Sequence, residues 1–278
     1  MRILVFLLLI PSFAFAQEFP LKYIEGLPDK QTKDVPVSHA YVLEQHSSMC
    51  VACAVTRAGE RMLEYDGNTD ARYVVAWTHY AGRNVVTEYK DNEVGIYGSD
   101  AALAISQIGF LRWDVLAPFE QRQLDAKPLE EFDWGGEDQW RFVFAKYKDK
   151  TDKYPVVCPT NVNEIALCLR KGLPVLFLSS ARWKSINMRD VDGKGGDRIE
   201  FGTTQYNTKD AHVVCLRDYY TLPVVKDGKE YPVEYCNLIN SHGEPPLPLK
   251  LIWLDWIQLD NKFSCFVILP KTYTPDKN

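Results

Sequence analysis

The segment Gln45-His46-Ser47-Ser48-Met49-Cys50-Val51-Ala52-Cys53-Ala54 joins a polar turn to the start of an amphipathic helix. From Cys50 onward, apolar residues recur at alternating steps of four and three positions, which places them on one helical face. The serines before Cys50 are favourable N-cap residues, so we expect the helix to begin within a residue or two of Cys50. A thiol there lies near the positive end of the helix dipole and near backbone N–H groups without intrahelical acceptors. Both favour the thiolate, which is the nucleophilic form.

The elements predicted after this helix divide the chain into a helical half and a strand-rich half. The further helices expected are 70–82, 99–107 closed by Gly109, part of 133–150, and 161–172 with Asn161 as N-cap. The strands expected are 173–178, 211–216, 235–240, 249–254 and 264–269. This order predicts an α+β fold with two lobes and a cleft between them.

His212 and Asn240 lie at the ends of two of these strands. If the strands 211–216 and 235–240 pair as an antiparallel hairpin, the two residues face each other at its open end. The asparagine oxygen then accepts a hydrogen bond from one imidazole nitrogen and fixes the tautomer, so that the other nitrogen faces the thiol.

The order of these residues resembles that of the papain-like cysteine peptidases. The family pattern is a Gln shortly before the Cys, a long helix from the Cys, a His on a strand and then Asn-Ser-Trp-Gly. The matching residues here are Gln45, Cys50-Val51-Ala52, His212 and Asn240-Ser241-His242-Gly243. The resemblance covers most of 35–269 and implies a helical N-terminal lobe of about 40–155 and an antiparallel β-rich C-terminal lobe of about 156–278.

The resemblance also implies a role for each matching residue. Cys50 is the nucleophile, His212 the general base and then acid, and Asn240 the residue that orients the imidazole. Gln45 and the Cys50 backbone N–H form the oxyanion hole, because a developing oxyanion needs preorganised donors. The implied activity is hydrolysis of peptide bonds in protein or peptide substrates, with no cofactor.

Several positions depart from the family pattern. Gln45 precedes Cys50 by five residues, one fewer than is typical, and Ala211 stands where a Gly usually precedes the His. His242 replaces the Trp that shields the His–Asn hydrogen bond from water. A polar, Gly-rich stretch at 181–210 lengthens the chain before His212.

Three alternatives remain open from the residues. Cys53 competes with Cys50 as the nucleophile, although Cys50 fits better because it lies in the first helical turn. A thiol–disulfide oxidoreductase using Cys50 and Cys53 is a second hypothesis. A papain-like fold that binds without catalysis is a third, motivated by Ala211 and His242. Within the fold, deamidation and acyl transfer use the same acyl-thioester chemistry as proteolysis, and the sequence does not separate them.

The first sixteen residues have the pattern of an export signal. Arg2 is a positive start, 3–10 an apolar stretch and Ala14-Phe15-Ala16 a cleavage motif. We therefore expect a mature domain of 17–278, exported to the periplasm or the medium, without a membrane anchor. The net charge of −5 for the whole chain argues against nucleic acid as a partner. The sequence does not predict an oligomeric state.

The seven cysteines are an odd number, so at least one thiol lacks a partner within the chain. Up to three disulfides fit this count in an exported protein, and so do several buried, inert thiols. Cys215 and Cys236 are expected not to bond to each other, because alternation along the hairpin places them on opposite faces.

No metal site is predicted. The acidic, Gly-rich segment 190–197 resembles a calcium loop, but it lacks the twelfth-position Glu of an EF-hand and reads better as a solvated loop. His46, His79 and His242 do not have metal-ligand spacing.

We predict that protein isolated from its native compartment begins at Gln17, because the cleavage motif directly precedes it. N-terminal sequencing tests this prediction. A mature chain that still begins at Met1 would contradict the export hypothesis.

Overall fold

A computed structural model describes residues 19–30, 50–68, 71–86, 96, 98–121, 137–179, 183–186, 198–201, 212–239, 247–251 and 263–274. The predicted leader 1–16, Gln45, Ala211, Asn240, His242 and the segment 190–197 lie outside these residues.

The first half of the chain is mainly helical. Its α-helices are α1 (Leu21–Glu25), α2 (Cys50–Tyr65), α3 (Val75–Tyr80), α4 (Gly98–Leu103) and α6 (Glu137–Tyr147). It also contains the π-helical turns η1 (Ala81–Val86) and η2 (Ala104–Ile108) and the 3₁₀ turn η3 (Trp113–Val115). Strands β1 (Phe110–Leu111) and β2 (Thr151–Asp152) pair at the edge of this region. A small core formed by α3, α6 and the segment around β1 centres on Trp77, which stacks on Phe144.

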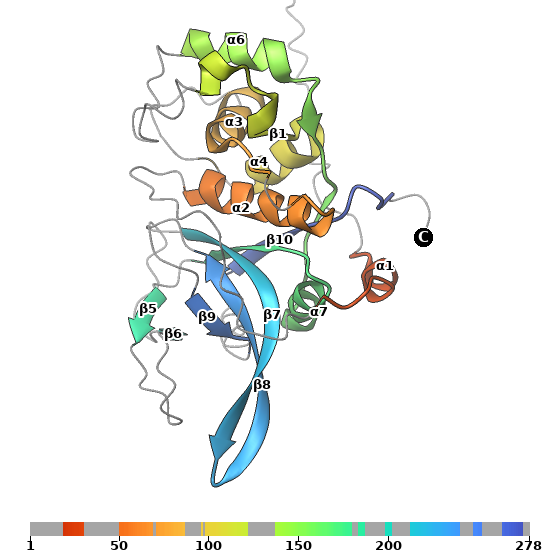
Figure 1. The fold of residues 1–278 in the computed structure, drawn as a ribbon, viewed down its shortest axis with the longest axis vertical. Coiled ribbons are helices and arrows are strands. Elements are labelled where there is room, and N and C mark those ends of the chain that lie inside the picture. Colours follow the sequence, from red (N-terminus) through yellow and green to blue (C-terminus); the bar gives the residue numbers. More distant parts are fainter. Residues whose placement is uncertain are drawn as a thin grey trace, which may run out of the picture.

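The second half forms an antiparallel sheet of six strands in the order β3-β10-β4-β7-β8-β9. Its strands are β3 (Val156–Val157), β4 (Val175–Ser179), β7 (His212–Lys226), β8 (Lys229–Ile239), β9 (Leu247–Lys250) and β10 (Phe263–Ile268). Helix α7 (Val162–Arg170) packs on β4 and β7, and Asn161 caps it by accepting a hydrogen bond from the Glu164 backbone N–H at 3.0 Å. Helices α2, α3, α4 and α6 lie above the large sheet in Figure 1, and α1 and α7 lie beside it, which gives the α+β architecture predicted from the sequence.

Helix α2 is the central element of the molecule. It contacts α3 and α4 on one side and β4, β7 and β10 on the other (Figure 1). The residues from Val51 to Gly59 are therefore all buried, not only those of the apolar face that the sequence predicted. A helix buried on all sides belongs to the interior of a protein. Gly59 is needed there, because a Cβ atom at this position would come within 2.8 Å of the Phe110 ring.

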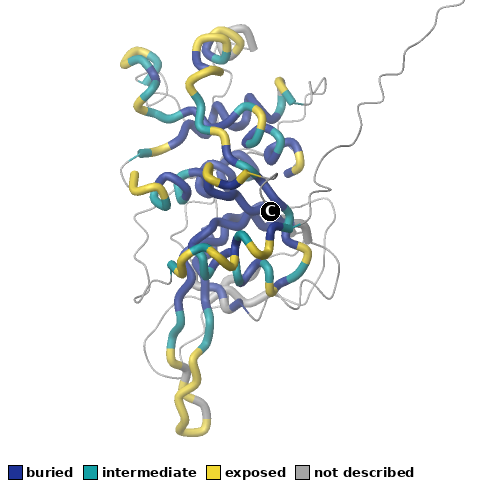
Figure 2. Tube along the Cα trace, turned by 90° about the vertical axis from the view of Figure 1, so that its right-hand side faces the viewer, coloured by how far each residue is buried: buried dark blue, intermediate teal, exposed yellow. Residues whose placement is uncertain are grey.

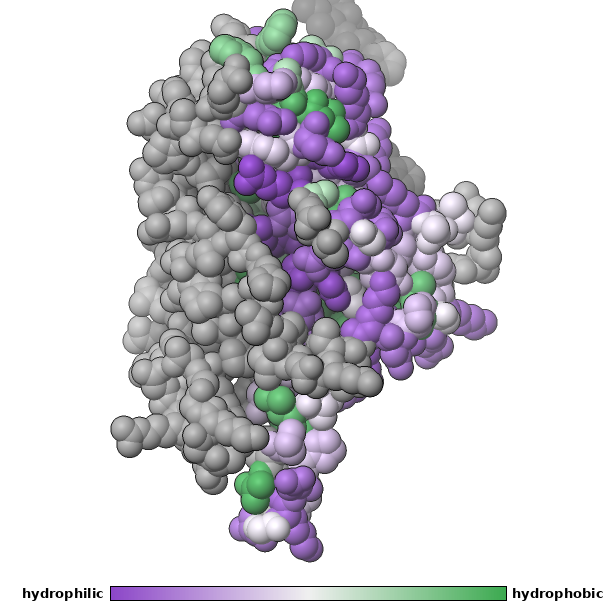
Figure 3. All heavy atoms as spheres, viewed as in Figure 1, coloured by the Kyte–Doolittle hydropathy of each residue, from purple (hydrophilic) through white to green (hydrophobic). Residues whose placement is uncertain are grey.

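Strands β7 and β8 continue beyond the sheet as a two-stranded ribbon. Residues 221–234 pair with each other around the turn Asp227-Gly228, whose φ angles of 53° and 72° suit a tight hairpin. The ribbon projects from the body and is exposed at its tip (Figures 1 and 2). Apolar side chains lie among hydrophilic ones on its surface (Figure 3). Pro223 lies opposite Pro232, so both strands lack a backbone donor there, which protects the ribbon from pairing with other strands.

The register of β7 and β8 differs from the one predicted. Facing His212 with Asn240 would place Cys215 opposite Asn237, whereas Cys215 lies opposite Ile239. The difference is two residues, so each side chain keeps its predicted face of the sheet. Cys215 and Cys236 are both free, as the prediction of opposite faces requires.

The segment before His212 contains strands that the sequence analysis missed. Strands β5 (Trp183–Ile186) and β6 (Arg198–Phe201) pair antiparallel within the stretch that was expected to be a polar insertion. A strand of four residues is too short for its apolar–polar alternation to be recognised within a polar segment.

We predict that Gly109→Ala lowers the free energy of unfolding by roughly 3 kcal/mol, because Gly109 has φ 90° and ψ 175°, a region open almost only to glycine. An added Cβ would also lie 2.7 Å from the Asp152 carbonyl oxygen. Gly67→Ala is the matched control, since Gly67 has the same φ of 90° but nothing within 4 Å of an added Cβ. Urea unfolding measures both variants, and equal losses would show that the close approach to Asp152 does not matter.

Candidate active site

Cys50 is the first residue of α2, as the sequence predicted. Its side chain is partly buried against the main core. The thiol is within hydrogen-bonding reach of the backbone N–H of Val213, the second residue of β7. The start of the helix and the start of the strand therefore meet at this sulfur atom.

The pKa of the Cys50 thiol is raised, whereas its place at a helix start led us to expect that the thiolate is favoured. Burial raises its pKa above the ordinary value, while hydrogen bonds from the backbone N–H groups of Val213, Val51 and Cys50 lower it. Burial is the larger effect, because removal of water penalises the charged form. The backbone donors expected from a helix N-terminus are present, but they do not by themselves produce a thiolate.

Cys53 is less suited to act as a nucleophile. Its side chain is 1% exposed and belongs to the main hydrophobic core. Burial raises the pKa of its thiol to about 12, and the nearby Arg57 lowers it only in part. Of the two cysteines, Cys50 is the accessible one.

The other predicted site residues are described only in part. His212 is placed by its backbone: it begins β7, lies opposite Ser179 of β4 and directly precedes Val213. Gln45 and Asn240 lie outside the described residues. The structure thus brings Cys50 to the strand that carries His212, and the roles of Gln45, His212 and Asn240 stay predictions.

An ion-pair network joins α2 to β7, and the sequence analysis did not identify it. Arg217 of β7 donates to Glu64 of α2 at 2.6 Å and to Asp218 at 2.9 Å. Arg61 of α2 lies 3.7 Å from Asp218. The signal in the sequence was the pair Arg217-Asp218 directly after the apolar run 213–216, since charged residues are rarely buried unless they are paired.

All seven cysteines are described, and all are free. The disulfides considered from the sequence are therefore absent from this structure, and the alternative of buried thiols fits most of these residues. Those that are buried are Cys53, Cys168, Cys215, Cys236 and Cys265. Desolvation raises the pKa of each of them, which makes them unreactive.

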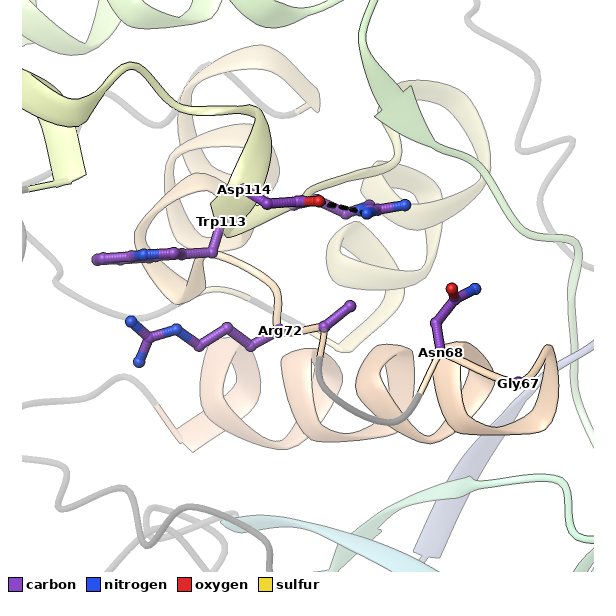
Figure 4. A pocket seen from close by; sticks show the side chains of 7 residues that line it. Gly67, Asn68, Arg72, Trp113 and Asp114 are labelled. Atoms are coloured by element: carbon purple, nitrogen blue, oxygen red, sulfur yellow. Dashed lines mark hydrogen bonds and ion pairs between the residues drawn. The ribbon is translucent and has the colours of Figure 1, made fainter.

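A polar pocket of about 390 Å³ opens at the other end of α2. The guanidinium of Arg72 lies 4.2 Å from the centre of the Trp113 ring, and Arg112 donates to Asp114 at 2.9 Å (Figure 4). Gly67 and Asn68, just after the helix, complete its edge. This pocket is not the predicted site, because Cys50 lies at the opposite end of a 16-residue helix, about 24 Å long.

Among the described residues, no group of three or more His, Cys, Asp or Glu side chains is arranged to hold a metal ion. No helix in the described ranges has the length and apolar character needed to cross a bilayer.

Comparison with solved structures finds this architecture in cysteine proteases. Xylellain, a cysteine protease from Xylella fastidiosa, aligns with a TM-score of 0.55 at 14% identity, over 92% of this chain and 91% of that one. Digestive procathepsin L 3 from the larval midgut of Tenebrio molitor aligns with a TM-score of 0.49 at 15% identity, over 90% and 78%. Neither a family model nor a curated protein matches the sequence. The similarity to xylellain shows that the chain has the papain-like two-lobe fold.

We predict that iodoacetamide near neutral pH labels Cys50 in preference to Cys53. Cys50 is partly exposed, whereas Cys53 is enclosed in the core. Labelling should disappear in Cys50→Ala and persist in Cys53→Ala, as measured by mass spectrometry of the peptide that contains both residues. Persistence in Cys50→Ala together with loss in Cys53→Ala would identify Cys53 as the nucleophile.

Proposed function

We propose that the protein is a papain-like cysteine peptidase that hydrolyses peptide bonds through a Cys50 thioester. This proposal rests on the position of Cys50. Its thiol lies at the start of α2 against the backbone of Val213, one residue after His212, in a fold shared with a cysteine protease.

The proposed reaction begins with proton transfer from Cys50 to His212. Because burial raises the pKa of the thiol, the thiolate has to be stabilised by the imidazolium that this transfer creates. Asn240 accepts from the other imidazole nitrogen and keeps the ring in place. Such a charged pair is most effective in a site with little water.

The thiolate then attacks the carbonyl carbon of the peptide bond. The resulting oxyanion receives hydrogen bonds from the Cys50 backbone N–H and the Gln45 side chain. The imidazolium of His212 gives its proton to the leaving amine as the C–N bond breaks. His212 next takes a proton from water, which attacks the thioester and releases the acid and the free thiol.

The substrate class proposed is protein or peptide, and the site of action is outside the cytoplasm. The basis for export is the leader pattern of 1–16, whose removal leaves a mature chain from Gln17. The alternatives are a binding protein without catalysis and an oxidoreductase using Cys50 and Cys53. The near-complete burial of Cys53 and its raised pKa weaken the second alternative.

We predict that His212→Ala abolishes hydrolysis, whereas Asn240→Ala reduces it by about 10- to 100-fold. Proton transfer requires the imidazole, while packing supplies part of the orientation that Asn240 provides. Cleavage of a mixed peptide library under mild reductant, followed by mass spectrometry, measures both variants.

Cys53→Ala is the control for this experiment and should retain hydrolysis. Full activity of His212→Ala would refute the papain-like mechanism. Absence of cleavage by the unmodified protein would favour the binding protein, and insulin reduction that requires both cysteines would favour the oxidoreductase.

A further inference from the structure

Four charged side chains from α2 and β7 come together at the interface between the two lobes. Two are cations and two are anions, so their charges balance. They are Arg61, Arg217, Glu64 and Asp218. Arg217 and Asp218 are only 6% and 4% exposed. Burying a charge away from water costs free energy unless the charge has a partner of good geometry.

Arg217 is the centre of this network. Its Nη2 donates to Glu64 Oε2 at 2.6 Å across the interface, and its Nε donates to Asp218 Oδ2 at 2.9 Å. Arg61 Nη1 donates to the same Glu64 oxygen at 2.9 Å. The planar guanidinium of Arg217 thus links two carboxylates in fixed directions, a geometry that a lysine ammonium cannot reproduce.

A local irregularity in β7 makes this arrangement possible. In a regular strand, Arg217 and Asp218 would point to opposite faces of the sheet. The pairing of β7 with β8 shifts between Arg217 and Tyr220, and Asp218 has a φ of 59°. This bulge brings both side chains toward α2, where Asn237 also donates to Asp218 at 3.4 Å. Bulges that redirect side chains in this way are frequent next to functional sites.

The network and the candidate site lie on the same two elements. Helix α2 carries Cys50 at its first position and Glu64 near its end, and β7 carries Val213 and then Arg217. The two elements are therefore joined twice, at Cys50 with Val213 and at Glu64 with Arg217. Because a helix is stiff, these two contacts together determine its orientation on the strand.

We propose that Arg217 is a positioning residue, which fixes α2 on β7 so that the Cys50 sulfur stays at proton-transfer distance from the imidazole of His212. This inference rests on the function proposed above. In this proposal, a buried ion-pair network that is remote from the substrate sets the alignment between the Cys50 nucleophile and the His212 base. A displacement of about 1 Å in such an alignment costs roughly 100-fold in rate.

The experiment measures the rate of Cys50 alkylation by iodoacetamide between pH 5 and pH 9 in the reduced full chain. In the unmodified protein, a thiolate–imidazolium pair keeps Cys50 reactive below pH 7. Arg217→Met should lower the rate at pH 6 by about tenfold or more and move the profile toward that of an ordinary thiol. Arg217→Lys should give an intermediate loss of alkylation rate. Lysine keeps the positive charge but lacks the planar guanidinium that donates to two carboxylates in fixed directions.

Glu64→Gln provides an independent test from the helix side, and it should slow alkylation in the same direction. The effects of Glu64→Gln and Arg217→Met should not add in the double variant, because both remove the same link. Arg170→Met is the matched control. It removes another arginine–carboxylate pair of this lobe, between α7 and Glu234 of β8, and should leave the profile unchanged.

Near-UV circular dichroism and thermal unfolding show which variants are folded, and Arg217→Lys and Glu64→Gln carry the test if Arg217→Met does not fold. A lower melting temperature with an unchanged alkylation profile would overturn the positioning role, since the network would then only stabilise the fold. An ordinary thiol profile in the unmodified protein would overturn the proposed function, and the positioning role with it.

Discussion

The structure depends on the packing of one buried helix against one strand. Helix α2 lies between the helical half and the sheet, and nearly all of its first ten residues are enclosed. Burial on all sides leaves little freedom for the helix to rotate or slide, because protein interiors are close-packed. The small residues Ala52, Ala54 and Ala58 allow neighbouring elements to approach, and Gly59 accommodates the Phe110 ring. The position of the Cys50 thiol follows from this packing, since the residue begins the same helix.

The sequence predicted the elements with a strong period and missed those without one. Helix α2 and the helix that begins after Asn161 were found because apolar spacing and capping residues agree. The length of β7 and β8 was underestimated, since their extension 221–234 is exposed around its tip and contains prolines, which usually argue against strands. The register of the hairpin was misplaced by two residues. Alternation determines the face of each residue but not which pairs face each other.

Some features of the candidate site were likewise predictable from the sequence, and others were not. Motif order singled out Cys50 as the candidate nucleophile, and the prediction that this residue begins a helix is confirmed. Its raised pKa was not predictable from local sequence, because the helix N-terminus is a local feature whereas desolvation comes from burial in the assembled fold. The ion-pair network was missed for the same reason. Arg61, Glu64, Arg217 and Asp218 become one group only after the two lobes assemble.

The raised pKa of Cys50 makes the proposed reactivity conditional on folding. In an unfolded chain, Cys50 is an ordinary thiol; in the folded chain, burial alone makes it a weaker acid than that. A buried nucleophile without an aligned base is therefore less reactive at neutral pH than an exposed one. Under the proposed function, the free energy that stabilises the thiolate comes from an imidazole on a different element, so reactivity appears only when α2 and β7 are joined. On the proposed function, peptide hydrolysis is then confined to the assembled protein.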